Sequence, residues 1–367
     1  MQLRTPGGIE RFVTTLANML STEYEVEIIA NYGKPTDTLA FHISPKVKLT
    51  FLTPTQPLEV SMKHLIFSFK WHRIPSELIR RRQITHTQKH AYRQYLTHLN
   101  TDFIITDRAA YNSLIANYYN GNAIKIATDH NFHQNNSKYI NELLSSIKSF
   151  DTLVVATKEL RDFYAKRTNV KCVTIPNPIP SIPTKKSPLT TKNLVSVGRL
   201  VPEKDYSLLI NVMNIIHTKD PDIHLTIIGD GTERQSLESQ INSLHLGNTI
   251  TLTGWLPQNK IAKYYYDSSL FIMTSKTEAF GLVLTEAMSY GLPCLALSRA
   301  SGARAQITKK TGILLNTSDP AVIAAKITDL LNHKDKLQSI QPFIIQEINN
   351  QYSTNIIRSK WIELLTF

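Results

Sequence analysis

The 367-residue sequence contains only two cysteines, and none of its apolar runs approaches the length of a membrane span. Cys172 and Cys294 stand alone among apolar residues, which excludes a disulfide framework and a cysteine-based metal cluster. No Gly-x-Gly-x-x-Gly sequence occurs, so the dinucleotide-binding fingerprint is absent. The first eight residues lack the apolar segment of a signal peptide. Together these absences predict a soluble protein of the reducing cytoplasm.

The chain carries a net charge of +12, and 42% of its residues are hydrophobic, which is the composition of a folded protein. Residues 1–185 carry nine of the excess positive charges, and the remainder carries three. On charge alone the partner is a nucleic acid, an anionic membrane surface or a phosphorylated substrate. The sequence has no helix-turn-helix, RNA-binding or zinc-finger pattern, so we expect no nucleic-acid partner.

Five prolines between residues 176 and 188 divide the chain, because proline fits neither a helix interior nor a central strand. On both sides, short apolar runs alternate with amphipathic helical segments, which indicates two α/β halves with parallel strands. We predict an N-terminal, acceptor-side Rossmann-like domain (1–180), a linker (181–192) and a second Rossmann-like domain (193–350). The C-terminal helix (351–367) is a candidate for packing back on the first domain.

The first half begins with a helix where a strand is expected. Apolar residues from Ile9 to Leu20 mark one helix face behind the turn Gly7-Gly8, and a strand is predicted at 26–30. A nucleotide-binding α/β domain normally places its central first strand before such a glycine turn. We therefore hypothesise that the natural protein carries one more strand upstream of Met1, and that the N-terminal sheet lacks its first strand here.

The most informative segment of the second half runs from Glu278 to Met288, between strands predicted at 270–273 and 294–297. Gly281 is expected to open the intervening helix, which puts Glu278 and Glu286 at the carboxyl edge of a parallel sheet, where ligands bind. Backbone N–H groups of the turn suit an anionic phosphate, and the two carboxylates suit sugar and ribose hydroxyl groups. From spacing alone, two solvated glutamates at a helix start are equally expected.

A second segment, Gly198–Asp205, follows the strand predicted at 194–197 and brings two cations to the same edge. Arg199 offers a planar fork for phosphate oxygens, and Lys204 offers a point charge. Alone this is weak evidence, because exposed Lys and Arg are common. The sequence Gly229-Asp230-Gly231 marks a tight exit from the strand predicted at 225–228.

Taken in order, these segments resemble the retaining glycosyltransferases of family 4. The resemblance is carried by Gly-Arg-Leu-x-x-Glu-Lys from Gly198, by Gly-Asp-Gly from Gly229, and by Glu-x7-Glu from Glu278, which runs into Glu-Ala-Met-x-x-Gly-x-Pro. The segments 7–10 and 175–178 are similar to that family too. The resemblance implies a GT-B fold, in which two Rossmann-like domains face each other across a cleft and the second domain holds most of a nucleotide-sugar donor.

The resemblance also implies roles for individual residues. Arg199 and Lys204 would neutralise the donor diphosphate without a metal ion or other cofactor, Glu278 would contact the donor sugar, and Glu286 would contact the nucleotide ribose. His130, after the strand predicted at 124–127, would touch the donor sugar; a loop histidine bonded to a neighbour is the alternative. We thus expect catalytic roles for His130, Glu278, Arg199 and Lys204. The expected donor-binding residues are Gly8, Gly198, Arg199, Lys204, Gly229, Leu256, Glu278, Ala279, Phe280, Gly281, Leu282 and Glu286.

The first half supplies candidates for the acceptor side. Asp107 and Arg108 lie at the exit of a strand predicted at 103–106, where they would meet an acceptor. The segment Lys63–Arg93 interleaves basic residues with aromatic and aliphatic ones, as in segments that lie on an anionic bilayer; a solvated helix face is the alternative. His86 and His90 have helical spacing but no evident third ligand, so we expect no metal site.

The sequence therefore predicts a retaining, metal-independent enzyme that moves a sugar from a nucleoside diphosphate donor to a hydroxyl group. The resemblance makes a UDP-sugar the default donor. The basic N-terminal half, where members of the family usually hold the acceptor, makes a lipid-linked glycan of surface polysaccharide assembly the expected acceptor, with the enzyme peripheral on the inner face of the membrane. Two alternatives stay open: the same chemistry on a soluble acceptor such as a sugar phosphate, and a non-catalytic subunit that binds a nucleotide-sugar and supports a partner.

Overall fold

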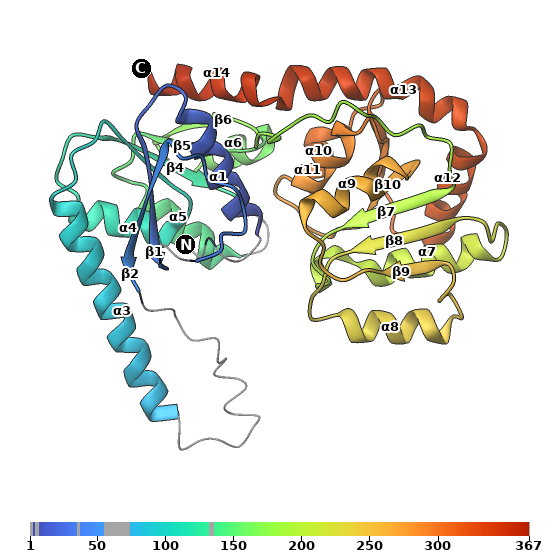
Figure 1. The fold of residues 1–367 in the computed structure, drawn as a ribbon, viewed down its shortest axis with the longest axis horizontal. Coiled ribbons are helices and arrows are strands. Elements are labelled where there is room, and N and C mark those ends of the chain that lie inside the picture. The colour runs from blue at the N-terminus through green and yellow to red at the C-terminus, as the bar shows by residue number, and fades with distance from the viewer. Residues whose placement is uncertain (1–2, 4–6, 35–36, 55–73, 132–135, 367) are drawn as a thin grey trace. The chain divides into compact units, whose positions relative to one another are not determined.

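The computed structural model describes residues 3, 7–34, 37–54, 74–131 and 136–366. Its chain divides into two compact units, both built from helices and parallel strands (Figure 1). The first unit comprises Met1–Asp129, Ser137–Val154 and Ala165–Val173. The second unit comprises His130–Asn136, Val155–Tyr164 and Thr174–Phe367. The predicted α/β fold class is confirmed.

The first part of the chain, through residue 174, forms two separate sheets. Strands β1 and β2 pair in parallel, and a four-stranded sheet has the order β3-β4-β5-β6. The elements are α1 (Gly8–Leu20), β1 (Val26–Tyr32), β2 (Val47–Thr53), α3 (Ile74–Thr97), β3 (Phe103–Thr106), α4 (Ala109–Tyr118), β4 (Ile124–Asp129), α5 (Ser137–Ser146), β5 (Thr152–Val155), α6 (Lys158–Ala165) and β6 (Lys171–Thr174).

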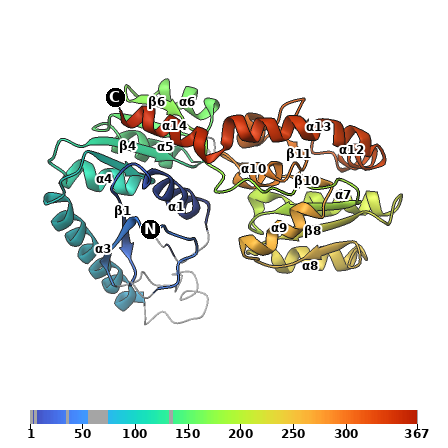
Figure 2. The ribbon, with the colours of Figure 1, turned by 45° about the horizontal axis from the view of Figure 1, so that its top comes forward.

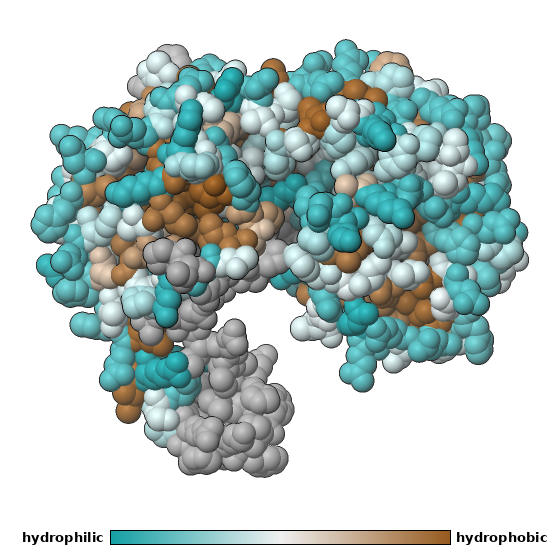
Figure 3. Space-filling model, in the orientation of Figure 1, coloured by the Kyte–Doolittle hydropathy of each residue, from teal (hydrophilic) through white to brown (hydrophobic). Residues whose placement is uncertain are grey.

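The two-stranded sheet is held by a small apolar cluster. Leu3, Ala17, Ile28, Ala30 and Val47 form its buried part, and half-buried aliphatic side chains surround it. Figure 3 shows hydrophobic side chains on the visible face around α1 and β1. As far as the described ranges extend, these two strands pair with no strand of the four-stranded sheet.

The second part of the chain forms one six-stranded parallel sheet with the order β12-β11-β10-β7-β8-β9. The five strands predicted there are confirmed, and β12 is an addition. The elements are β7 (Asn193–Val197), α7 (Tyr206–His217), β8 (His224–Ile228), α8 (Arg234–Ser243), β9 (Ile250–Leu252), α9 (Gln258–Tyr266), β10 (Leu270–Met273), α10 (Leu282–Ser289), β11 (Cys294–Leu297), α11 (Ser301–Gln306), β12 (Gly312–Leu315), α12 (Pro320–Asn332), α13 (Lys334–Glu347) and α14 (Thr354–Leu365).

Two layers of helices cover this sheet (Figures 1 and 2). Helix α7 packs against α8 and α12, and α10 packs against α13. The inner strands have almost no accessible side-chain surface: β10 and β11 are buried along their whole length, and Leu194, Val195 and Phe271 are each 0% exposed. Short apolar strands buried on both faces are typical of a parallel sheet between helices, which explains why the strand runs are apolar without alternation.

The strand order reverses between β7 and β10. The chain moves outward from β7 through β8 to β9, then returns to place β10 on the other side of β7 and continues to β11 and β12. Leu270 of β10 is in register with Leu194 of β7, so the carboxyl ends of these two strands lie together. In α/β sheets, ligands bind at the carboxyl edge where the strand order reverses in this way.

Candidate active site

The loop that leaves β7 carries two cationic side chains at this edge of the sheet. Leu200 is fully buried and anchors the loop, whereas Arg199 beside it is exposed. A 3-10 turn over Pro202–Lys204 follows, and the side chain of Lys204 is 16% exposed. Arg199 forms no ion pair with the residues that the structure describes. The loop therefore presents one half-buried and one exposed cation.

The loop that leaves β10 carries Glu278 and ends at Gly281, which caps α10. Gly281 has φ 83° and ψ 65°, in the left-handed region that favours glycine, so its conformation is the reason for glycine at this place. The carbonyl oxygen of Glu278 accepts hydrogen bonds from the backbone N–H of Gly302 and the hydroxyl of Ser301, each at 2.9 Å. The side-chain amide of Gln306 donates to the carbonyl of Phe280. Helix α11 thus fixes the shape of this loop.

The two loops meet through their functional side chains. The ammonium of Lys204 donates a hydrogen bond to the carboxylate of Glu278, whose side chain is 21% exposed. Ala279, Phe280 and Gly281 donate no backbone hydrogen bond to any residue that the structure describes. A cation, a carboxylate and a run of N–H groups without acceptors therefore lie together at the β7–β10 edge, which suits a phosphorylated sugar.

Glu286 lies in the second turn of α10 and is buried, with 6% of its surface exposed. The hydroxyl of Tyr265 donates a hydrogen bond to its Oε2 at 3.2 Å, and the amide of Gln258 lies at 3.5 Å. Both partners belong to α9, so Glu286 links α10 to the neighbouring helix. Its contact with a ribose stays a prediction.

The backbone segments that follow β7, β8 and β9 pack closely against one another. Gly229 at the end of β8 has φ 147°, and a Cβ atom there would lie 1.9 Å from the carbonyl oxygen of Gly198. Gly229 also forms an isolated bridge with Gly254, beyond β9. The neighbouring Leu256 is half-buried against the core, whereas Trp255 is 58% exposed. Glycine is required at residue 229 because any side chain would displace the β7 exit.

The remaining predicted residues lie in the first half of the chain. Gly8 is the first residue of α1, and His130 directly follows β4 and is half-buried. Asp107 follows β3, is 7% exposed, and its Oδ2 accepts no hydrogen bond from the described residues. Burial raises the pKa of Asp107, and the neighbouring Arg108, with Nε at 3.8 Å, partly opposes that rise. Arg108 also pairs with Glu10 at 3.1 Å, so the acceptor-side candidates form one charged cluster.

Within the described part of the chain, no group of three His, Cys, Asp or Glu side chains is placed to hold a metal ion. The sequence has one Asp-x-Asp pattern, at Asp220 and Asp222, which precedes β8 at the amino edge of the sheet. Lys192 forms an ion pair with Asp220, with its Nζ 2.6 Å from the Oδ2 of Asp220. This pattern therefore lies at the opposite edge from Lys204 and Glu278.

Only part of the basic segment predicted at Lys63–Arg93 is described, because residues 55–73 lie outside the described ranges. Its second half forms α3, on which Arg80, Arg82 and Lys89 are exposed. Leu78 and Ile79 on the same helix are 49% and 58% exposed. Among the described helices, none is both long and apolar enough to cross a bilayer.

The structure adds two residues to which sequence reasoning gave no role. Asp205, directly after Lys204, forms an ion pair with Arg299 from the loop between β11 and α11, at 2.6 Å. Asp205 was part of the β7-loop motif, but its partner has no recognisable sequence pattern. Only the adjacency of β7, β10 and β11 in the sheet brings the two together.

Comparisons with known proteins bear on the family and the fold. Residues 181–344 match the family model of glycosyl transferases group 1. The chain is 26% identical to an uncharacterized glycosyltransferase of Haemophilus influenzae, over all of this chain and 98% of that protein. It is also 26% identical to the exopolysaccharide phosphotransferase SCO2592 of Streptomyces coelicolor, over 98% of this chain but only 39% of that longer protein.

Solved structures show the same fold. Sucrose-phosphate synthase from Thermosynechococcus elongatus matches with a TM-score of 0.78 at 17% identity, over 98% of this chain and 93% of that one. Anabaena Alr3699/HepE, solved in complex with UDP and glucose, matches with a TM-score of 0.73 at 17% identity, over 100% and 98% of the two chains. Residues 181–344 are therefore similar to glycosyl transferases of group 1, and the whole chain shares the fold of these solved structures.

Proposed function

We propose that this protein is a retaining glycosyltransferase that uses a UDP-sugar and needs no metal ion. The observation that carries the proposal is the contact between Lys204 and Glu278 at the carboxyl ends of β7 and β10, with the exposed Arg199 on the same loop. One loop supplies the charge that a diphosphate needs, and the other supplies the carboxylate that a sugar hydroxyl needs.

In the proposed reaction, the bond between the anomeric carbon and the diphosphate oxygen breaks, and the acceptor oxygen bonds to that carbon. The proton of the acceptor hydroxyl leaves with the nucleoside diphosphate. Lys204 and Arg199 stabilise the negative charge that grows on the departing diphosphate, which is the role a metal ion has in other transferases. Glu278 orients the donor sugar, Glu286 holds the ribose, and His130 contacts the sugar from the end of β4.

Binding and turnover of UDP-sugars test the proposal. Purified protein with a panel of UDP-sugars should slowly hydrolyse at least one of them, and Lys204→Ala should abolish that hydrolysis. Lys192→Met is the matched control, because Lys192 forms a similar ion pair at the opposite edge of the same sheet. If no nucleotide-sugar binds, or if both variants lose activity equally, the proposed donor site is wrong. Tight binding without turnover on any acceptor would instead indicate the non-catalytic subunit.

Retention and metal independence are tested on the product. NMR of the transferred sugar should show the anomeric configuration of the donor, and activity should persist in excess chelator. An inverted product, or activity restored only by added Mg²⁺ or Mn²⁺, contradicts this part of the proposal.

We further propose that the acceptor is a lipid-linked glycan at an anionic membrane surface. The exposed Arg80, Arg82 and Lys89 on α3 support this, together with the exposed Leu78 and Ile79 near the start of the helix. Figure 3 shows hydrophobic beside hydrophilic side chains at that end of α3. Basic residues attract anionic head groups, and neighbouring aliphatic side chains enter the interface. A relative whose name refers to exopolysaccharide is consistent with such an acceptor.

A further inference from the structure

The backbone of Asp205 is held in an uncommon conformation directly beside Lys204. Its φ of 53° and ψ of 46° lie in the left-handed region, where a residue with a side chain is disfavoured. Asp205 also precedes the first turn of α7, yet its side chain caps no N–H group of that helix. Such strain persists only where surrounding contacts fix it, and it is common at functional sites.

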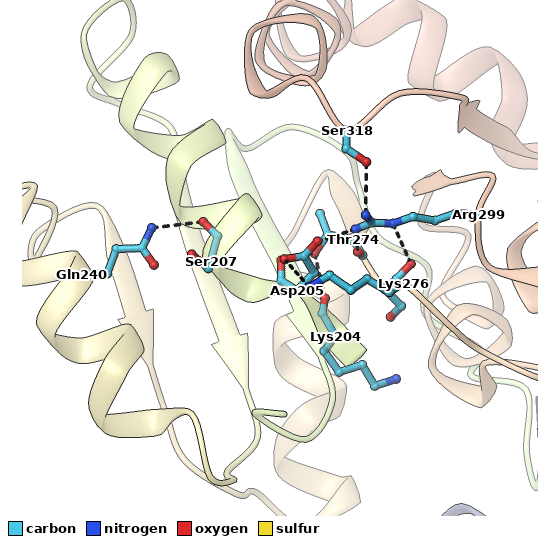
Figure 4. Close-up of polar contacts among 9 residues, drawn as sticks. Lys204, Asp205, Ser207, Gln240, Thr274, Lys276, Arg299 and Ser318 are labelled. Atoms are coloured by element: carbon cyan, nitrogen blue, oxygen red, sulfur yellow. Dashed lines mark hydrogen bonds and ion pairs between the residues drawn. The ribbon is translucent and has the colours of Figure 1, made fainter. Parts of the chain in front are cut away.

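The Asp205 carboxylate is instead held by two cations from other loops. Arg299 donates from Nη2 to Oδ2 at 2.6 Å, and Nζ of Lys276 lies 3.6 Å from Oδ1 (Figure 4). Asp205 is 15% exposed and Arg299 29%, so solvent screens this pair less than a surface ion pair. Figure 4 also shows that the side chain of Lys204 extends away from this group.

Arg299 reaches three elements of the sheet at once. Besides Asp205, it donates to the carbonyl of Thr274 at 2.6 Å, to that of Ser275 at 3.3 Å and to the hydroxyl of Ser318 at 3.1 Å. The planar guanidinium makes such a multi-directional contact possible, and a lysine would lose most of it. Arg299 therefore ties the β7 loop to the end of β10 and to the segment after β12.

The backbone around Lys204 is fixed to the same place. The hydroxyl of Thr274 lies 3.1 Å from the carbonyl oxygens of both Lys204 and Asp205. The backbone N–H of Lys276 donates to the carbonyl of Glu203 at 2.7 Å. The turn that carries Lys204 is thus held against the strand end that leads to its partner Glu278.

We propose that Asp205 and Arg299 are positioning residues that set the place of the Lys204 ammonium for the donor diphosphate. This inference rests on the proposed function, because it assigns the pair its role through Lys204. Displacement of a charged group by about 1 Å can cost about 100-fold in rate. The pair holds the turn in the conformation that directs Lys204 toward Glu278, before any donor arrives.

Substitutions at Asp205 separate the carboxylate from the backbone conformation. Asp205→Gly keeps the left-handed backbone at low cost but removes the carboxylate. Asp205→Asn tolerates that conformation and retains an oxygen that accepts from Arg299. We expect Asp205→Gly to weaken UDP binding by roughly 10- to 100-fold, which is the range for loss of a hydrogen bond to a charged group, and Asp205→Asn to restore most of the affinity. Arg299→Met should behave as Asp205→Gly does.

The decisive test measures coupling to Lys204 by calorimetric titration with UDP. If Asp205 acts through Lys204, the loss caused by Asp205→Gly should disappear in a Lys204→Ala background, because the two changes then remove the same interaction. Additive losses would overturn the inference and indicate a general structural role. Asp220→Asn is the matched control, since its ion pair with Lys192 has the same 2.6 Å separation and a similar exposure; it should leave the UDP affinity unchanged.

The failure of this inference is distinguishable from the failure of the proposed function. If the wild-type protein binds neither UDP nor any UDP-sugar, the proposed function fails. If the wild-type protein binds UDP and both Asp205→Gly and Arg299→Met bind it equally well, only the positioning role fails.

Discussion

At the scale of single residues, the carboxylates of Asp205 and Asp107 differ in how well their charge is compensated. Asp205 has two cations on its carboxylate, whereas Asp107 has one oxygen without a hydrogen bond and Arg108 only at 3.8 Å. An ionised carboxylate without adequate partners destabilises the fold. Asp107 is therefore the residue at which protonation should change stability.

We predict that Asp107→Asn stabilises the protein at neutral pH. Burial raises the pKa of Asp107 above the ordinary value of 3.8, so the folded state binds the proton more tightly than the unfolded state. Stability should then fall as the pH rises from below 3.8 through the raised pKa, and the amide lacks this titration. Urea unfolding at pH 3, 5 and 7 should show an advantage of Asp107→Asn that grows with pH.

The exposed Asp162 supplies the control for this experiment, since Asp162→Asn also removes one carboxylate. If both variants change stability in parallel across the pH range, net charge explains the result and the burial of Asp107 does not.

At the scale of helices and strands, α3 is the element whose role is open to the most direct test. We predict that the triple variant with Arg80, Arg82 and Lys89 changed to Glu binds anionic liposomes at least about 100-fold more weakly, because it loses three attractions and gains three repulsions. Each basic residue near such a surface contributes about 1 kcal/mol. Co-sedimentation with vesicles of phosphatidylglycerol and phosphatidylcholine measures this, and binding should weaken as salt is added.

The matched control reverses three other exposed lysines, Lys171, Lys219 and Lys309. Equal weakening by both triple variants would show non-specific attraction by the net charge. Absence of any salt-sensitive binding by the wild-type protein would favour a soluble acceptor.

Most elements of the second half could be predicted, because its strands are short apolar runs bounded by turns. The structure adds β12, at Gly312–Leu315, and β2, β5 and β6 in the first half. Strand β2 alternates apolar and polar residues from Val47 to Phe51, which is a strand signal that the sequence analysis did not use. Strand β6 begins with an exposed lysine and has no apolar run. Strands of four residues show no periodicity, so they are predicted only where they form an apolar run bounded by turns, as β10 and β11 do.

The sequence also placed Lys204 and Glu278 correctly on two loops at one sheet edge, but it could not predict their contact. That contact depends on β10 lying beside β7, a pairing of non-consecutive strands that local pattern does not encode. Arg299 was missed for the same reason. Its partner lies 94 residues away in the chain, and a single arginine in a loop carries no pattern of its own.

At the scale of the whole molecule, the two units differ in how their sheets are supported. Ile28 belongs to a two-stranded sheet over a small cluster, whereas Val195 lies on a strand with neighbours on both sides in a six-stranded sheet. Local opening is easiest where few apolar contacts must break. We predict that amide hydrogens of β1 exchange much faster than those of β7.

The same hydrogen-exchange measurement, repeated in the presence of UDP, tests which unit binds the nucleotide. UDP at a hundred times its dissociation constant should stabilise the part that binds it by about 2.7 kcal/mol. Amides of β7 that exchange by global opening should then slow by roughly 100-fold, while those of β1 should be unchanged. Equal protection of both strands in the absence of UDP, or slowing confined to β1, would contradict the prediction.

The return of the chain to β7 has a consequence for how the protein is made. Glu278 lies 74 residues after Lys204, so at about 5–20 residues per second the ribosome needs roughly 4–15 seconds to supply the second loop. Until β10 emerges, one edge of β7 stays open to other strands. A nascent chain that stops just before Glu278 contains β7 to β10 but lacks the carboxylate of the proposed donor site. Under the proposed function, stalled chains are therefore expected to capture a nucleotide-sugar only after the loop that follows β10 has emerged.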